Sequence, residues 1–280
     1  MTEVACIADS TGSFRKPPLA ELGRDLLRVG RLEVTGSLVL PFACVAGFFF
    51  AASYHAWWAA VFFAVVQSFF TYASISHDLV HRTLGLPNWL NELLLSAIET
   101  LNFRSGHAFR VTHLHHHARF PDSSDIEGQA AAMLWWRALI EGLSAQPRYF
   151  VWAWRHCGGT GASRSWLAVE GVMVTVLLVA CIASYPSNPA PIVYASLILA
   201  GSWIFPFMTS FMPHRAHEKI PIRQTRLFRG SVIRCLTFNH LYHLEHHLYP
   251  QVPHHRWPQL AEKLDPFFKE AGIPEIRLGK

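Results

Sequence analysis

Residues 166–184 read WLAVEGVMVTVLLVACIAS, and this stretch decides what kind of fold the chain can adopt. Glu170 is its only charged residue, and no further charge appears before Met212. A second block, residues 32–75, is equally apolar and carries only Glu33 near its start. A membrane span needs about 20 apolar residues, so each block of about 45 is long enough for two spans. The sequence therefore predicts four transmembrane helices.

Each apolar block contains a turn that would fold it into a helical hairpin. The first turn is expected at residues 53–55 and the second at residues 185–189, where the sequence YPSNP is rich in residues that break helices. The spans would then cover about residues 34–53, 56–76, 166–184 and 191–212. Composition agrees with this interpretation, because only 15% of the residues are charged and 51% are hydrophobic. Buried core helices of a soluble protein are the less favoured alternative.

The basic residues are sorted around these spans. Of 24 Lys and Arg residues, five precede the first span, eight lie between the hairpins and eleven follow the last span. The two short turns therefore contain none, and the positive-inside rule predicts that both termini and the central segment face the cytoplasm. The net charge of +5 then suits contact with anionic lipid headgroups, and no nucleic-acid-binding module is visible.

The central segment contains two helical patterns that are too short and too charged to span the membrane. One runs from Trp89 to Leu101 and the other from Met133 to Leu143. Both are rich in tryptophan and leucine, which favours a position at the membrane surface. We predict an all-α integral membrane protein with a cytoplasmic N-terminal segment (1–33), a membrane domain with a cytoplasmic helical cap (34–265) and a C-terminal tail (266–280).

Most of the 17 histidines fall into three clusters beside the predicted spans. The clusters read HDLVH at residues 77–81, HLHHH at residues 113–117 and HLEHH at residues 243–247. Residues at positions i, i+3 and i+4 share one helix face, so each cluster can aim its imidazoles at a common point. The residues with this spacing are His77, His81, His113, His116, His117, His243, His246 and His247.

Eight well-placed histidines are more than one metal ion needs, since a structural zinc takes four ligands and a catalytic zinc about three. The count therefore favours two metal ions. The five cysteines are scattered and form no C-x-x-C pair, so the ligands are expected to be nitrogen. Imidazole binds iron, copper, nickel and zinc alike, and the ligand type does not choose among these metals.

With these three clusters, the chain resembles the integral-membrane fatty acid desaturase superfamily, which includes carotenoid hydroxylases and ketolases. The resemblance rests on H-D-x-x-H at 77–81, H-x-x-H-H at 113–117 and H-x-x-H-H followed by LYP at 243–250, and it extends over about residues 34–265. It implies two iron ions held mainly by histidine, O2 as oxidant and attack on an unactivated C–H bond of a lipid.

In better-described members of this superfamily, one more histidine near the end of the fourth span completes the metal shell. His214 occupies that position here, 29 residues before His243, and His217 and His240 are its rivals. Some acyl desaturases have an asparagine one helical turn earlier, where this chain has Ser210. Any contact that such an asparagine makes through water is therefore in doubt here.

The remaining histidines and the nearby carboxylates receive other roles. We expect His55, His156, His254 and His255 to be exposed or in contact with lipid headgroups, and His115 to be exposed or behind a ligand. His107 could stand behind a ligand or take part directly. Metal-bound histidines usually donate their other ring N–H to a carboxylate or a carbonyl. The candidates for that role are Asp78, Asp122, Asp125, Glu127 and Glu245, of which some are expected behind a ring and the rest in solvent, whereas Glu170 is expected at the membrane interface.

The leading prediction is an O2-dependent di-iron lipid oxidoreductase, with fatty acyl desaturation as first choice. Carotenoid hydroxylation or ketolation is a close alternative, because the chain is short for an acyl desaturase and carries an acidic turn at residues 121–125. Electrons are expected from a separate ferredoxin-like or cytochrome-type protein, since the HPGG motif of a fused cytochrome b5 is absent. A histidine-rich metal transporter or metal-storage protein is the alternative from another class.

Overall fold

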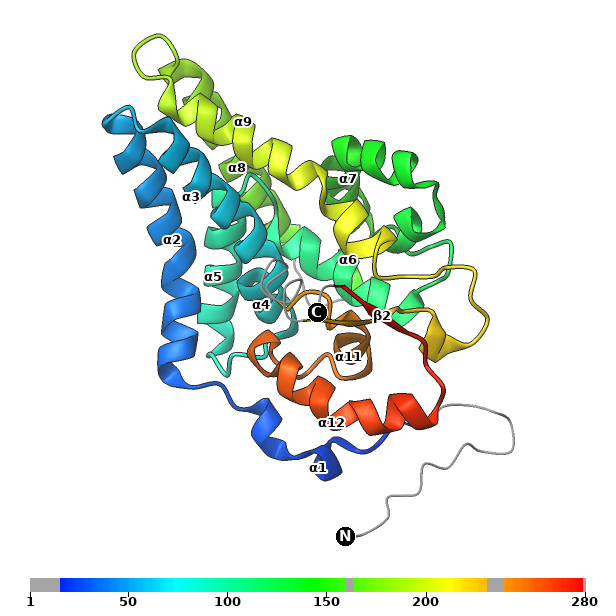
Figure 1. Ribbon diagram of the computed structural model, residues 1–280. Helices are drawn as coiled ribbons and strands as arrows, with labels where there is room; N and C mark the ends of the chain where they lie inside the picture. Colours follow the sequence, from blue (N-terminus) through cyan, green and yellow to red (C-terminus); the bar gives the residue numbers. More distant parts are fainter. Residues whose placement is uncertain (1–15, 160–163, 231–238, 279–280) are drawn as a thin grey trace.

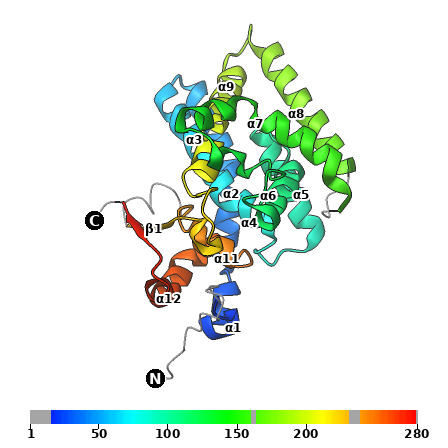
Figure 2. The ribbon, with the colours of Figure 1, turned by 90° about the vertical axis from the view of Figure 1, so that its right-hand side faces the viewer.

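The computed structural model describes residues 16–159, 164–230 and 239–278 (Figure 1). Arg15, Cys6, Cys235 and residues 160–163 of the glycine-rich connector before the third predicted span lie outside these ranges. The described chain is mostly helical, and most of its helices pack into one body with the long helices at one end (Figures 1 and 2).

Within the described ranges, four helical runs are long and apolar enough to cross a membrane: Arg24–Ser53, Trp57–His81, Arg164–Ser184 and Ala190–Phe211. They match the four predicted spans in number and position. The first run begins about ten residues before the predicted span, and the second continues past residue 76 through the first histidine cluster. The parts of the second run are α3 (Trp57–Phe70), a π-helical stretch (Thr71–Ser76) and α4 (His77–His81).

The outward faces of these runs are apolar. In α8 (Arg164–Ser184), Val172, Val176, Val179 and Ile182 are each about 60% exposed. Their spacing of three or four residues places most of them along one side of the helix. An exposed apolar surface of this kind is unfavourable in water and favourable against lipid. The exposure of these apolar side chains therefore supports the interpretation of the runs as membrane spans.

The fourth apolar run lies between the second and the third, so the long helices do not pack in sequence order. α2 (Arg31–Ser53) lies along α3, α3 contacts α9 (Ala190–Trp203), and α8 contacts α9 (Figure 1). The side chains of Phe48 and Tyr194 meet edge to face with ring centroids 5.0 Å apart. The Tyr194 hydroxyl also donates to the carbonyl of Leu101, at 3.0 Å. This bond ties α9 to the end of α5 (Asn88–Leu101).

The helices that carry the other histidines lie at the opposite end from the turns at residues 54–56 and 185–189 (Figures 1 and 2). α6 (Gly106–Arg119) carries the second cluster, and α11 (His243–Leu248) carries the third. α7 (Trp135–His156) is longer than the predicted helical pattern at residues 133–143, although Trp135 and Leu143 are exposed as expected for a surface helix. Its position at a membrane surface stays a prediction.

A small core closes this end of the molecule. α12 (Trp257–Glu270) packs Trp257, Leu260 and Leu264 against Leu22 and Leu26 from the N-terminal segment. Two short strands, β1 (Leu227–Arg229) and β2 (Glu275–Arg277), pair in parallel beside it. The all-α prediction missed these strands, because three residues are too few to show an alternating pattern and their partners lie far apart in the sequence.

Candidate metal centre

Nine buried or half-buried histidines converge at this end of the molecule in two groups. Within each group, one nitrogen from every ring lies within 4.8 Å of the others. The first group contains His77, His81, His113, His117 and His246, and the second contains His116, His214, His243 and His247. These are the nine histidines that the sequence selected, and the structure divides them into two sets.

The first group draws on three helices. α4 supplies two rings, α6 supplies two and α11 supplies one. The Nε2 atom of His113 lies 3.0 Å from that of His77 and 3.1 Å from that of His117. The Nε2 atom of His246 is 2.8 Å from that of His117. The Nε2 atom of His81 is buried and has no hydrogen-bond partner among the described residues.

The second group is built by α6, α11 and the end of the fourth apolar run. The Nε2 atom of His214 lies 3.1 Å from that of His247 and 3.2 Å from that of His243. His116 meets the rings of His214 and His247 edge to face. His116 and His117 are neighbours in α6 and serve different groups, so the two groups adjoin.

These distances fit metal ions. Bonds of about 2.1 Å from a metal to two imidazole nitrogens at a right angle place the nitrogens about 3.0 Å apart. Burial and the neighbouring rings lower the pKa values of His113, His117, His243 and His246, so these imidazoles are neutral near pH 7. A neutral imidazole is the form that binds a metal. The donor set is therefore suited to two divalent cations.

Carboxylates and a carbonyl stand behind three of the rings. Nδ1 of His113 lies 2.8 Å from Glu127, and Nδ1 of His116 lies 2.7 Å from Asp125. Nδ1 of His214 lies 3.0 Å from the carbonyl of Ser210. Such contacts fix the tautomer, so that the N–H points outward and Nε2 faces the centre.

The acidic turn after α6 contains two carboxylates behind histidine rings and one exposed carboxylate. Asp125 and Glu127 are buried behind ring nitrogens, whereas Asp122 is exposed. Burial raises the pKa of Glu127 to about 8. Burial alone would lower the pKa of His116, but the hydrogen bond to Asp125 and the charge of that carboxylate raise it.

Two other carboxylates do not have the predicted role. Asp78 accepts from the backbone N–H of His254 at 3.0 Å and contacts its Nδ1 at 2.5 Å. Glu245 lies 2.7 Å from the guanidinium of Arg229. Neither contacts a ring of the nine histidines in the described part of the chain. Asp78 and Glu245 therefore connect their histidine clusters to other segments of the chain, at His254 and Arg229.

The fourth apolar run places His214, not its rivals, in the second group. His217 is exposed. His240 is buried beside His243, with ring centroids 5.2 Å apart, but it belongs to neither group. π-helical stretches precede His77 (Thr71–Ser76) and come just before His214 (Pro206–Phe211). Such insertions are frequent at functional sites, and here they alter the helix face shortly before a ring of each group.

Among the other histidines, the expectation for His254 was wrong. His254 is 6% exposed and is held by Asp78, because α12 folds back over α4. Its neighbour His255 is half-buried and lies 2.9 Å from the Ser37 hydroxyl. His55 and His156 are exposed as expected. His115 is half-buried beside Trp152, outside both groups.

His107 and Glu170 form a contact that the sequence did not reveal. Glu170 is fully buried, not interfacial, and lies 2.7 Å from Nδ1 of His107. Nε2 of His107 lies 2.8 Å from Glu92. Both ring nitrogens therefore face carboxylates, and His107 has none left for a metal. The 63 residues that separate His107 from Glu170 explain why no local pattern indicated this pair.

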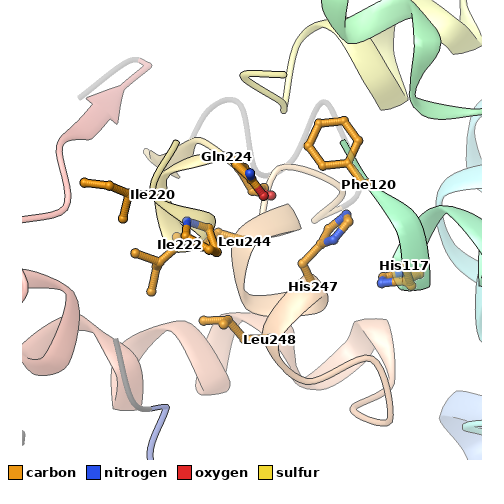
Figure 3. Close-up of a pocket in the computed structure, with 10 residues that line it drawn as sticks. His117, Phe120, Ile220, Ile222, Gln224, Leu244, His247 and Leu248 are labelled. Atoms are coloured by element: carbon orange, nitrogen blue, oxygen red, sulfur yellow. The ribbon is translucent and has the colours of Figure 1, made fainter. Parts of the chain in front are cut away.

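A cavity of about 300 Å³ adjoins both groups (Figure 3). His117 of the first group and His247 of the second both line it. The rest of the wall is mostly apolar, formed by Phe120, Pro221, Ile220, Ile222, Leu244 and Leu248, with Gln224 and Thr225 as its other polar residues. An apolar molecule in this cavity would touch one ring from each group.

A family model described as fatty acid desaturase matches residues 52–279, which include all nine histidines. No curated protein matches the chain.

Proposed function

Because this chain belongs to the fatty acid desaturase family, we propose that it is an O2-dependent di-iron oxidoreductase that acts on a C–H bond of a lipid. Fatty acyl desaturation is the first choice of reaction. Family membership implies an oxidoreductase, and the four apolar runs fit a membrane protein. The metal, the oxidant and the substrate are parts of this proposal.

In this proposal, His77, His81, His113, His117 and His246 hold one iron, and His116, His214, His243 and His247 hold the other. Iron supplies the redox chemistry with O2 that removes hydrogen from carbon, which redox-inert zinc could not perform. The chain's own part is to keep nine imidazoles aimed inward. Asp125, Glu127 and the carbonyl of Ser210 do this by holding the outer nitrogens of three rings.

The cavity beside the two groups is the observation that carries the lipid-directed function. Its wall combines His117 and His247 with apolar side chains. Apolar walls exclude water and favour a hydrocarbon segment over a polar molecule. A chain bound there would present its C–H bonds to both groups at once (Figure 3).

Orientation and electron supply complete the proposal. The distribution of Lys and Arg favours cytoplasmic termini and a cytoplasmic site. A separate ferredoxin-like or cytochrome-type protein would then deliver electrons from that side. The basic residues on this face suit an acidic carrier as well as anionic headgroups.

The test is heterologous expression with a suitable electron donor, followed by mass spectrometry of the lipids and carotenoids. A fatty acyl product that is two mass units lighter supports desaturation, and a carotenoid that gains oxygen supports the hydroxylase or ketolase alternative. A metal-dependent growth or uptake phenotype without any oxidised lipid would favour the transporter alternative. The convergence of the nine histidines at one end, instead of along the spans, argues against transport.

A further inference from the structure

Arg110 is a buried charged residue on α6 that belongs to neither histidine group. Its side chain is 2% exposed, and it lies one helical turn before His113. A buried guanidinium is costly unless its N–H groups find partners. The partners of Arg110 therefore indicate what it does.

Two of these partners are carbonyls of α4. Nη2 of Arg110 donates to the carbonyl of Leu79 at 2.8 Å, and Nε donates to that of Val80 at 3.3 Å. The buried Asn91 donates to the Leu79 carbonyl as well, at 2.8 Å. These carbonyls belong to the last turn of α4, and the Leu79 carbonyl also accepts from the backbone N–H of Arg82, at 3.3 Å.

The last turn of α4 contains His81, which belongs to the first group. α4 is only five residues long, begins with His77 and ends with His81. The left-handed backbone of Arg82 then turns the chain away. α4 is the last part of the second apolar run, and the end of a helix frays unless other contacts hold it. Arg110 and Asn91 hold the two residues that precede His81.

A chain of ionic contacts supports Arg110 from behind. Its guanidinium contacts Glu92, which also lies 2.8 Å from Nε2 of His107. His107 in turn contacts Glu170 of α8, at 2.7 Å, and stacks on Trp166 with ring centroids 4.7 Å apart. The Ser105 hydroxyl donates to the same Glu170 carboxylate at 2.5 Å. The contacts thus run from α8 across α5 and α6 to the end of α4.

We propose that Arg110 is the positioning residue for His77 and His81, fixing the end of α4 against a buried chain of contacts through Glu92, His107 and Glu170. This inference rests on the two-metal function proposed above and assigns Arg110 to the first group alone. The second group has its own supports in Asp125 and the Ser210 carbonyl.

A proton route through the same residues would be the other use for such a chain. Glu92 contacts Arg82, whose side chain is 44% exposed, so this end of the contacts lies near the surface. The other end of the chain stops at Glu170, which contacts Ser105 and His107. In the described residues, neither carboxylate touches a ring of the two groups. The contacts therefore fit mechanical support better than proton delivery.

The test compares Arg110→Lys with Arg82→Lys in the full chain, purified in lipid nanodiscs and titrated with ⁵⁷Fe²⁺ without oxygen. Lysine keeps the charge beside Glu92 but cannot donate in a fixed fork to two carbonyls. Arg82 contacts the same carboxylate without touching the α4 carbonyls through its side chain, so Arg82→Lys is the matched control. Mössbauer spectra of His81→Ala and His243→Ala would assign the signals of the two groups.

For Arg110→Lys we expect iron in the first group to bind about 10- to 100-fold more weakly, as for other residues behind a ligand, with the second group unchanged. Wild-type affinity and spectra at both groups would overturn the inference. If Arg110→Lys does not fold, Asn91→Ala decides, because it removes one donor to Leu79 without leaving a charge unpaired. A severalfold loss at the first group is then expected, and no change overturns the inference. Failure of the wild-type protein to bind two irons would instead refute the proposed function.

Discussion

The two ends of α6 use the same residue types for different purposes. At its C-terminal end, His113 and His116 each offer Nδ1 to a carboxylate, and their rings turn inward toward other imidazoles. At its N-terminal end, His107 has a carboxylate at both nitrogens. Burial is nearly the same at both ends. A buried histidine is therefore a ligand candidate only when one of its nitrogens has no acidic partner.

The largest expected effect comes from the C-terminal end of α6. His116→Ala removes a ring from the second group, and we expect turnover to fall by more than about 100-fold, since loss of an outer partner alone costs about 10- to 100-fold. Iron content per chain and lipid turnover in nanodiscs are the measurements. His255→Ala is the control, because His255 lies outside both groups and should keep full iron and activity. Full iron and turnover in His116→Ala would show that the ligand set is wrong.

A smaller effect is expected from the carboxylates behind the rings. Asp125→Asn keeps the shape of the side chain but weakens the contact to Nδ1 of His116. We expect iron in the second group to bind about 10- to 100-fold more weakly, measured by competition with a chelator. Asp122→Asn is the matched control, because Asp122 is exposed in the same turn. Equal affinities for the two variants would remove Asp125 from the centre.

At the N-terminal end of α6, the expected effect is on stability instead of metal binding. His107→Leu leaves the buried Glu170 without its ring partner, which costs about 3–5 kcal/mol of unfolding free energy in comparable buried pairs. The folded fraction should still bind two irons, with the first group at most severalfold weaker, because Arg110 keeps its own contacts to α4 and loses only the support from His107. Denaturant unfolding and iron analysis test this together. Loss of iron without loss of stability would show that His107 serves metal binding, as the histidines at the C-terminal end of α6 do.

The smallest effect at neutral pH concerns His240, which is buried beside the second group. Burial lowers its pKa from 6.5 to about 4. Below pH 6.5 the unfolded chain takes up a proton that the folded chain refuses, so acidification to pH 4 costs up to about 3 kcal/mol of stability. His240→Leu should flatten this part of the pH dependence of the melting temperature and keep two irons. A lost iron would instead make His240 a ligand.

Much of the centre could be predicted from the sequence because the patterns that define it lie within short, continuous stretches of the chain. The spacing of His113, His116 and His117 is that of one helix face, and the four apolar runs are continuous in the sequence. The ninth histidine, His214, came from the position of a related residue in the superfamily. Its place in the second group depends on a π-helical stretch that no hydrophobic pattern indicated.

What the sequence did not reveal depends on contacts between distant segments. His254 follows the third cluster in a polar stretch, yet it is buried against Asp78, 176 residues away. Glu170 looked interfacial because it begins an apolar run, but α5 and α6 cover it and supply its partner. Burial of a single polar residue is decided by which helices meet there, and periodicity within one helix does not contain that information.

The central claim is that the nine histidines hold two irons in two distinct groups. Anaerobic titration of the wild-type protein in nanodiscs with ⁵⁷Fe²⁺, followed by Mössbauer spectroscopy, tests it most directly. We predict saturation at two irons per chain and two signals, of which His113→Ala affects the first and His243→Ala the second. Saturation at one iron per chain, or a single signal that both substitutions remove together, would contradict the claim.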